Sequence, residues 1–506
     1  MRDANRKRGP GMAEKASVKI PFRDQLWLQM DTPDNLMYIN SLMWFEEIPD
    51  WDAITTVIAK KIVDPYPVFR RVSERRGRRW YWVDFPEFDF DAHFSRSTLP
   101  GDGGRDEAEK LISERISVPL PAGRPMWSIE YIENYHGHDG PDGQEGALVL
   151  FRVQHGLVDG VRLTQLLLSL CEIDDDALPP KVGRDLAPRG GLLRTATEAG
   201  AGLVKDSLGI ATGLGGAAAV FPLTLTKLVK DVAAPGFQVT RVPTRVVESL
   251  TSIVGPTNKT ANTYRALFRL LWEPRTPRRS WSGRPGAEKR VSWISGVDLA
   301  GVKRVAKAHD STVTIVMTAA VSRALTEYLR TQGDKPLAAI NLMIPMSVAP
   351  VGEGAPAELG NHITLILLRL PLGVDDSQQL INEITSSMTR VQYSFEPHAT
   401  YAAIVGSAAV PSGLTNSLVD VVANKSIGQL TSVPGPSGPV TFGGVPVGGL
   451  LGWVPMTGDQ SLGVCIYSYN GQVSVGIATD AGLVPEPGVL ARMIGEQFET
   501  FAGWNE

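Results

Sequence analysis

The clearest pattern of hydrophobic and polar positions runs from residue 146 to residue 171, where a period of two changes to a helical period. Most residues from Gly146 to Gln154 are apolar, and successive side chains of a strand point to opposite faces, so both faces are predicted to be buried. Further on, apolar residues recur at helical spacing: Leu163, Leu166, Leu167, Leu170 and Cys171. The pattern predicts a core strand, a tight turn and a helix packed on the core.

The predicted turn contains two residues that can carry chemistry, His155 and Asp159. His155 is predicted at the end of the core strand, where a neutral imidazole with an ordinary pKa near ~6.5 can take a proton from an alcohol or a thiol. Asp159 is well placed to cap the following helix by accepting its free backbone N–H groups. On residue type alone, a hydrogen-bonded core or turn histidine and an ordinary N-cap are the favoured interpretations of His155 and Asp159.

The region around this turn, residues 21–175, is predicted to form one αβ domain. Trp51–Val63 has a helical pattern, and Arg79–Val83 has the aromatic and β-branched content of a strand. The turn-rich residues 139–146 lead into the core strand as a hairpin connection.

Residues 291–506 are predicted to form a second αβ domain. Ser295 followed by Asp298 resembles a helix start, and a second helix is expected from Thr312 to Gly333. Residues 338–346 and 363–370 have the apolar character of buried strands, so helices are expected to cover the sheet. The Gly- and Pro-rich residues 431–454 are expected to form a loop system with strands on either side.

Between these domains, residues 176–290 are rich in Gly and Ala and are predicted to form a long helical crossover. Within this region, Ser207–Thr226 contains no charged residue and has the length of a membrane-spanning helix. Its several glycines and Pro222 make its apolarity modest. A segment lying on a lipid surface or a helical linker that shields the domain interface therefore fits better than a membrane span.

The first twenty residues are predicted to be a disordered, solvated tail. They contain no apolar stretch of the kind found in secretory signals. The basic residues Arg6, Lys7 and Arg8 would attract an anionic membrane surface only weakly.

Composition excludes several classes of function. A chain of 506 residues with 43% hydrophobic residues can bury a large core, and its net charge of −4 argues against nucleic acid as a partner. Cys171 and Cys465 lie in apolar runs and are interpreted as buried thiols of a reducing compartment. No clustered Cys and His residues suggest a metal, and no Gly-rich phosphate loop follows a predicted strand.

Several motifs resemble those of a known enzyme family. The segment from His155 to Gly160 resembles the HxxxDG signature of the chloramphenicol-acetyltransferase-like superfamily. Further segments are similar to motifs of the bacterial wax ester synthase/acyl-CoA:diacylglycerol acyltransferases: Phe22–Glu46, Arg124–Trp127, Leu359–Asn361, Val433–Pro436 and Tyr469–Asp480. The resemblance runs from about Pro21 to the C-terminus and keeps the order of the family's motifs.

The chain departs from the family pattern at three places. Gln154 stands where the family has the first of two histidines, Thr314–Ile315 stands where it has Asn-Asp, and Thr431–Ser432 stands where it has Ser-Asn. Because side chains alternate along a strand, Gln154 is predicted to point away from the face that carries His155.

The resemblance implies an α/β fold of two chloramphenicol-acetyltransferase-like domains, each a mixed sheet covered by helices. It implies an O-acyltransferase that moves a fatty acyl group from acyl-CoA to diacylglycerol or a long-chain alcohol, with acyl-CoA as a substrate and no cofactor. His155 would be the general base, and Asp159 would act indirectly, through a salt bridge to an arginine that the sequence does not identify. Gln154 and Gly160 would support the motif, and the residues implied for substrate binding are Asn361, Thr431, Ser432 and Gly435.

Other interpretations stay open. Gly360–Asn361 fits a tight turn as well as a ligand contact, Thr431 and Ser432 fit turn hydroxyls that bond their own backbone, and His362 fits a surface or turn residue better than a second base. The whole chain also fits a catalytically silent lipid-binding protein, or a condensation enzyme that depends on a carrier protein. The expected location is the cytoplasm, with peripheral attachment to the inner membrane or to lipid inclusions as an alternative.

Overall fold

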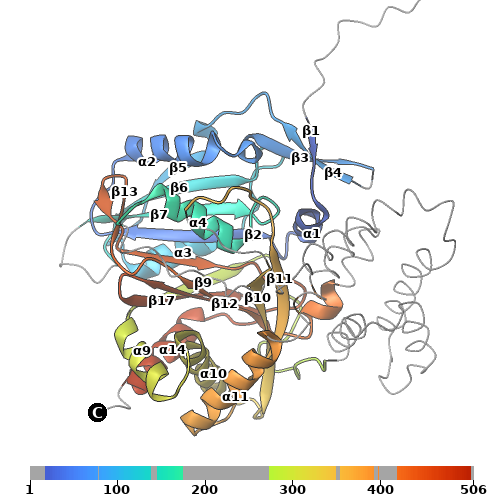
Figure 1. The fold of residues 1–506 in the computed structure, drawn as a ribbon, viewed down its shortest axis with the longest axis vertical. Coiled ribbons are helices and arrows are strands. Elements are labelled where there is room, and N and C mark those ends of the chain that lie inside the picture. Colours follow the sequence, from blue (N-terminus) through green and yellow to red (C-terminus); the bar gives the residue numbers. More distant parts are fainter. Residues whose placement is uncertain are drawn as a thin grey trace, which may run out of the picture.

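The computed structural model (Figure 1) describes residues 17–77, 79–137, 145–174, 273–348, 354–392, 397, 400 and 419–502. The predicted tail up to residue 16 and most of the predicted crossover, including Ser207–Thr226, lie outside the described residues. Among the helices that the structure describes, none is long and apolar enough to cross a membrane.

The N-terminal half is built on a five-stranded mixed sheet in the order β15-β2-β7-β6-β5. Only β5 and β6 pair in parallel. The strands are β2 (Tyr38–Phe45), β5 (Phe94–Thr98), β6 (Trp127–Tyr135), β7 (Gly146–Gln154) and β15 (Gly449–Trp453). Every residue of β7 is buried, which confirms the predicted core strand.

Helices cover both faces of this sheet. Val149 of β7 packs in one cluster with residues of α2 (Trp51–Ile58), the π-helical turn that follows it (Ala59–Val63) and α4 (Gly160–Leu170). Leu148, on the opposite face, packs with α3 (Arg105–Ile116) and with the C-terminal half. The predicted helix at residues 51–63 is therefore confirmed, with a wider last turn. Two short 3-10 helices, Pro67–Arg70 and Asp91–His93, complete this half together with α1 (Phe22–Met30).

A small antiparallel sheet in the order β1-β4-β3 lies beside α1 (Figure 1). Its strands are β1 (Ser17–Lys19), β3 (Arg71–Arg76) and β4 (Arg79–Asp84). β4 confirms the predicted strand. The prediction of a disordered tail is wrong for Ser17–Lys19, because the unpaired edge of β4 offers backbone hydrogen bonds to this segment.

The C-terminal half contains a six-stranded mixed sheet in the order β11-β10-β12-β16-β17-β9. The strands are β9 (Lys289–Asp298), β10 (Ala339–Ser347), β11 (Ile363–Pro371), β12 (Gly428–Pro434), β16 (Leu462–Tyr469) and β17 (Gln472–Asp480). Four helices pack on the side away from the N-terminal half (Figure 1): α9 (Leu299–Ala308), α10 (Val313–Thr331), α11 (Ser377–Gln392) and α14 (Pro487–Ala502). The predicted strands and the predicted long helix are confirmed.

Two details of this half differ from the predictions. Ser295 lies inside β9 and does not begin a helix; Asp298 is the N-cap of α9 and accepts the backbone N–H groups of Ala300 and Gly301. Residues 431–454 contain strands as well as loops, because Thr431 and Ser432 belong to β12.

The C-terminal half of the sequence contributes strands to the N-terminal half. β15 comes from the C-terminal half of the sequence but pairs with β2 at the edge of the N-terminal sheet. Nearby, β13 (Val440–Phe442) pairs with β14 (Val445–Pro446) and with β8 (Glu172–Ile173). This strand addition has no signal in the sequence pattern, and it joins residues from both halves in one core around β2.

Candidate functional site

His155 is the first residue after β7, in the turn that leads to α4. Its backbone N–H donates to the carbonyl oxygen of Met37 at 2.8 Å, which ties the turn to the start of β2. The residue is only 5% exposed. Its imidazole stacks on the indole of Trp27 from α1, with ring centroids 3.6 Å apart and an angle of 9° between the planes. The imidazole is therefore held in one plane before any substrate arrives.

Asn361 holds the edge of this imidazole from the other half of the molecule. Its side-chain oxygen lies 2.8 Å from Nδ1 of His155, and its side-chain nitrogen donates to the carbonyl oxygen of His155 at 2.8 Å. Because an amide oxygen only accepts hydrogen bonds, Nδ1 carries the hydrogen and Nε2 is left as the proton acceptor. The structure brings together two predicted site residues that are 206 positions apart.

Burial controls the protonation of His155. It lowers the pKa of the imidazole to about 4, and the charge of Asp159 and the contact with Asn361 oppose this shift. The side chain is therefore neutral at pH 7, which is the form that can accept a proton.

Asp159 organises the turn and does not bond the imidazole. Its Oδ1 accepts the backbone N–H of Arg162 at 2.9 Å, as the N-cap of α4. Its Oδ2 lies 3.0 Å from Nη1 of Arg162 and accepts the backbone N–H of His362 at 2.8 Å. Arg162 is thus the arginine that the sequence did not identify. The carboxylate joins α4 to the segment that carries Asn361.

Gln154 is fully buried and acts as a brace at the end of β7. Its side-chain nitrogen donates to the carbonyl oxygen of Trp27 at 3.2 Å, and its side-chain oxygen accepts the backbone N–H of Gly156. A Cβ on Gly156 would lie 2.7 Å from that oxygen, so a larger residue there would displace the Gln154 side chain from this hydrogen bond.

The two glycines predicted in the site have different surroundings. A Cβ on Gly160 would meet nothing within 4 Å, so packing does not demand a glycine at this position. Gly435 follows β12, and a Cβ there would lie 2.6 Å from the carbonyl oxygen of Ser468. Close approach of two backbones therefore explains Gly435 without a ligand.

Thr431 and Ser432 lie half-buried on β12. The hydroxyl of Ser432 lies 3.4 Å from the hydroxyl of Thr314, which is on the first turn of α10. Two of the three departures from the family pattern therefore contact each other. His362, predicted as a surface or turn residue, is half-buried, and its Nε2 is enclosed without a hydrogen-bond partner in the described part of the chain.

Neither the contact of Trp27 with His155 nor the identity of the arginine was predicted from the sequence. Arg162 follows Asp159 at i+3 on a helix, a spacing that does predict a pair. Trp27 has no comparable local signal, because its contact with His155 joins residues far apart in the sequence.

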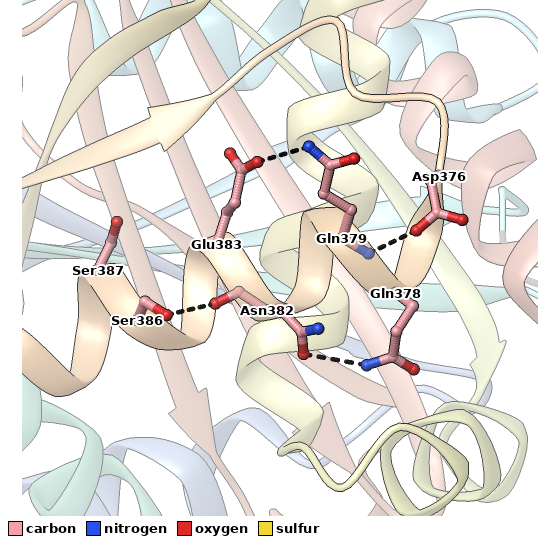
Figure 2. A pocket seen from close by; sticks show the side chains of 7 residues that line it. All are labelled: Asp376, Gln378, Gln379, Asn382, Glu383, Ser386 and Ser387. Atoms are coloured by element: carbon pink, nitrogen blue, oxygen red, sulfur yellow. Dashed lines mark hydrogen bonds between the residues drawn. The ribbon is translucent and has the colours of Figure 1, made fainter.

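Cavities do not by themselves locate the site. A shallow hollow of about 560 Å³ lies along α11. Figure 2 shows the seven polar side chains that line it: Asp376, Gln378, Gln379, Asn382, Glu383, Ser386 and Ser387. Its side chains bond one another; for example, Gln379 donates to Glu383 at 2.9 Å. A second cavity of about 30 Å³ lies between the halves beside Tyr38 and Trp453. It has room for about one water, so an acyl chain would have to displace side chains there.

The chain matches the models of one known protein family. The model of the wax ester synthase/diacylglycerol acyltransferase catalytic domain matches residues 22–317, and the model of the C-terminal domain of the same family matches residues 359–501. A putative diacylglycerol O-acyltransferase of Mycobacterium tuberculosis is 25% identical, over 94% of this chain and 88% of that protein. The O-acyltransferase WSD of Acinetobacter baylyi is 25% identical, over 95% of this chain and 96% of that protein.

Solved structures share the fold. The wax ester synthase/diacylglycerol acyltransferase from Marinobacter aquaeolei VT8 matches with a TM-score of 0.59 at 20% identity, over 96% of this chain and all of that one. The first condensation domain of the calcium-dependent antibiotic synthetase matches with a TM-score of 0.54 at 15% identity, over 97% of each chain. The predicted mixed α/β fold of two domains is confirmed.

Proposed function

Because this chain belongs to the wax ester synthase/diacylglycerol acyltransferase family, we propose that it transfers a fatty acyl group from acyl-CoA to diacylglycerol or to a long-chain alcohol. His155 is the general base of this reaction. The observation that carries the proposal is the buried, neutral imidazole whose Nδ1 faces Asn361, since this leaves Nε2 to accept a proton. Relatives named as diacylglycerol O-acyltransferases support the choice of acceptor.

The proposed reaction proceeds by direct transfer. Nε2 of His155 accepts the proton of the acceptor hydroxyl while the hydroxyl oxygen attacks the thioester carbon. The tetrahedral intermediate then collapses, the C–S bond breaks, and the imidazolium returns the proton to the thiolate of CoA. One side chain serves both half-steps, and no acyl-enzyme forms.

Oriented general-base catalysis supplies about 10²–10⁴-fold of rate acceleration. The stacked indole of Trp27 adds to this, because an aromatic face attracts the positive charge that the imidazole gains during the reaction. Donors to the intermediate's oxyanion supply a further part of the acceleration.

The remaining predicted residues have supporting roles in this proposal. Asp159 positions the turn through Arg162 and the backbone of His362, and Gln154 braces the strand end. Thr431 and Ser432 contribute to substrate binding, with the contact between Ser432 and Thr314 at the positions where the family has other polar groups. Gly435 lets the backbone after β12 approach Ser468 closely. Peripheral contact with a lipid surface belongs to the proposal, because both substrates carry long acyl chains. The proposal keeps the division into domains at residues 21–175 and 291–506, with β15 of the second segment completing the sheet of the first.

The test is the release of free CoA by the purified protein, given palmitoyl-CoA with either hexadecanol or dioleoylglycerol. We expect release that requires an acceptor and falls by about 10²-fold or more in His155→Gln. His309→Gln, at the end of α9, is the matched control and keeps full release. If palmitoyl-CoA binds but neither acceptor supports release, the proposal fails in favour of a silent lipid-binding protein. Release only from a loaded carrier protein would indicate a condensation enzyme.

A further inference from the structure

A buried carboxylate also accepts hydrogen bonds from Asn361. Asp24 of α1 is 3% exposed. Its Oδ1 accepts two hydrogen bonds from Asn361, one from the backbone N–H at 2.6 Å and one from the side-chain nitrogen at 3.0 Å. His155, Asn361 and Asp24 therefore form a continuous chain of contacts.

These contacts allow the Asn361 amide only one orientation. Its two N–H groups donate to Oδ1 of Asp24 and to the carbonyl oxygen of His155. Rotation of the amide by 180° would turn its oxygen toward those two acceptors and its nitrogen toward Nδ1 of His155, so both of these hydrogen bonds would be lost. An amide turned this way would also donate to Nδ1, and the ring hydrogen would then reside on Nε2.

The turn before Asn361 is shaped around the same carboxylate. Gly360 has a φ of +100°, and a Cβ on it would lie 3.0 Å from Oδ2 of Asp24. The carbonyl oxygen of Gly360 accepts the backbone N–H of Asp159, which connects this turn to the one that carries His155. A glycine is therefore needed where Asp24 approaches.

We propose that Asp24 is a positioning residue: by fixing the orientation of the Asn361 amide, it keeps the hydrogen of His155 on Nδ1 and leaves Nε2 free to accept the proton of the acyl acceptor. The inference rests on the proposed function of His155. Asp24 acts as a hydrogen-bond acceptor and not as a charge, because Oδ1 still accepts both hydrogen bonds when a proton resides on Oδ2. Burial raises the pKa of Asp24 to about 6, so both forms occur near neutral pH.

Two substitutions of Asp24, both by residues of similar size, distinguish a role as hydrogen-bond acceptor from a role as a negative charge. Asp24→Asn keeps an oxygen at the position of Oδ1, so we expect kcat within about threefold of the parent. Asp24→Leu removes one of the two acceptors of the Asn361 amide and leaves the other, the carbonyl oxygen of His155. The preference for the present amide orientation is then weaker, so the rotated amide and the Nε2–H form of His155 become populated. We expect kcat to fall by about 10–100-fold with the KM for palmitoyl-CoA nearly unchanged, because the loss lies in the base.

The position of the ring hydrogen is measured directly by ¹⁵N NMR of histidine-labelled protein. The chain has seven histidines, and the spectrum of His155→Gln identifies the signals of His155. We expect the Nδ1–H form in the parent and in Asp24→Asn, and a large share of the Nε2–H form in Asp24→Leu. If Asp24→Leu does not fold, Asp24→Ala is measured in its place.

Glu109 provides the matched control. This partly buried carboxylate of α3 also joins the two halves. It accepts hydrogen bonds from the hydroxyl of Ser292 at 2.8 Å and from the backbone N–H of Trp293 at 3.3 Å. We expect Glu109→Leu to lower the melting temperature but to leave kcat and the His155 signals unchanged. The inference is overturned if Asp24→Leu keeps the Nδ1–H form, whether or not kcat falls. Because the NMR result needs no turnover, it also tests Asp24 if the proposed acyl transfer fails.

Discussion

The indole of Trp27 and the imidazole of His155 lie face to face, with centroids 3.6 Å apart. Trp27 belongs to α1 and His155 to the turn after β7, and Gln154 joins the two elements by donating to the carbonyl oxygen of Trp27. The stack restricts the rotation of the imidazole and offers an aromatic face to the charge that the ring acquires when protonated.

Replacement of Trp27 tests this stack. A cation over an aromatic face gains about 0.5–2 kcal/mol, so we expect Trp27→Leu to lower kcat by about tenfold. Trp27→Phe keeps an aromatic face and should lose about threefold. Steady-state rates of CoA release measure both. If Trp27→Leu and Trp27→Phe lower kcat equally, the aromatic face does not stabilise the charged imidazole, and Trp27 acts only through packing.

The lowered pKa of His155 predicts the pH dependence of activity. Because burial lowers the pKa to about 4, kcat/KM should stay level from pH 8 to about pH 5 and fall only as the imidazole gains a proton. A profile with its midpoint near ~6.5, the ordinary histidine value, would contradict the buried geometry. The free energy of unfolding should fall over the same direction of pH. As pH falls from ~6.5 toward 4, His155 gains a proton in the unfolded chain while it stays neutral in the folded protein, so the folded state loses stability.

Gln154 should contribute to stability more than to chemistry. Gln154→Ala leaves the carbonyl oxygen of Trp27 and the N–H of Gly156 without partners, so the free energy of unfolding should fall by about 2 kcal/mol or more. We expect kcat to fall far less than in His155→Gln. Urea unfolding and CoA release measure the two effects. Gln460→Ala, which removes another fully buried glutamine, should lower stability similarly without changing kcat.

The pair of Asp159 and Arg162 should be strongly coupled. Asp159 is fully buried and the Arg162 side chain is 11% exposed, so Asp159→Ala removes a helix cap and leaves a largely buried cation unpaired. We expect a loss of about 3 kcal/mol. Arg162→Ala should cost less, because Asp159 keeps its backbone donors. A double-mutant cycle by urea unfolding measures the coupling, and additive losses would show that the ion pair contributes nothing.

Glu109 gives a pH-dependent stability prediction. Burial raises its pKa from 4.5 to about 6, so the folded protein binds a proton more readily than the unfolded chain, and this carboxyl's contribution to stability grows as pH falls from 6 to 4.5. Glu109→Gln keeps an oxygen for Ser292 and Trp293 without the charge. We expect it to raise the melting temperature at pH 8 and to change it little at pH 5. An equal rise at both values would contradict the shift.

Local patterns were sufficient for much of the fold. The strand before His155, the cap by Asp159 and the helix after it follow from side-chain periodicity and backbone capping, which act over a few residues. The same is true of α10, whose start at Thr312 and end near Gly333 carry their own signals. Ser295 was misassigned because a capping pattern of two residues also occurs by chance inside a strand.

The sequence by itself determined that a histidine would stand after a core strand beside a capped helix. Only the tertiary structure decided that Asn361 contacts its Nδ1, that Trp27 covers its face, and that β15 crosses into the N-terminal sheet. These features depend on packing between segments hundreds of residues apart, where periodicity carries no information about partners. The protonation form of His155 belongs to the same group, because it depends on which amide atom the assembled fold presents to the ring.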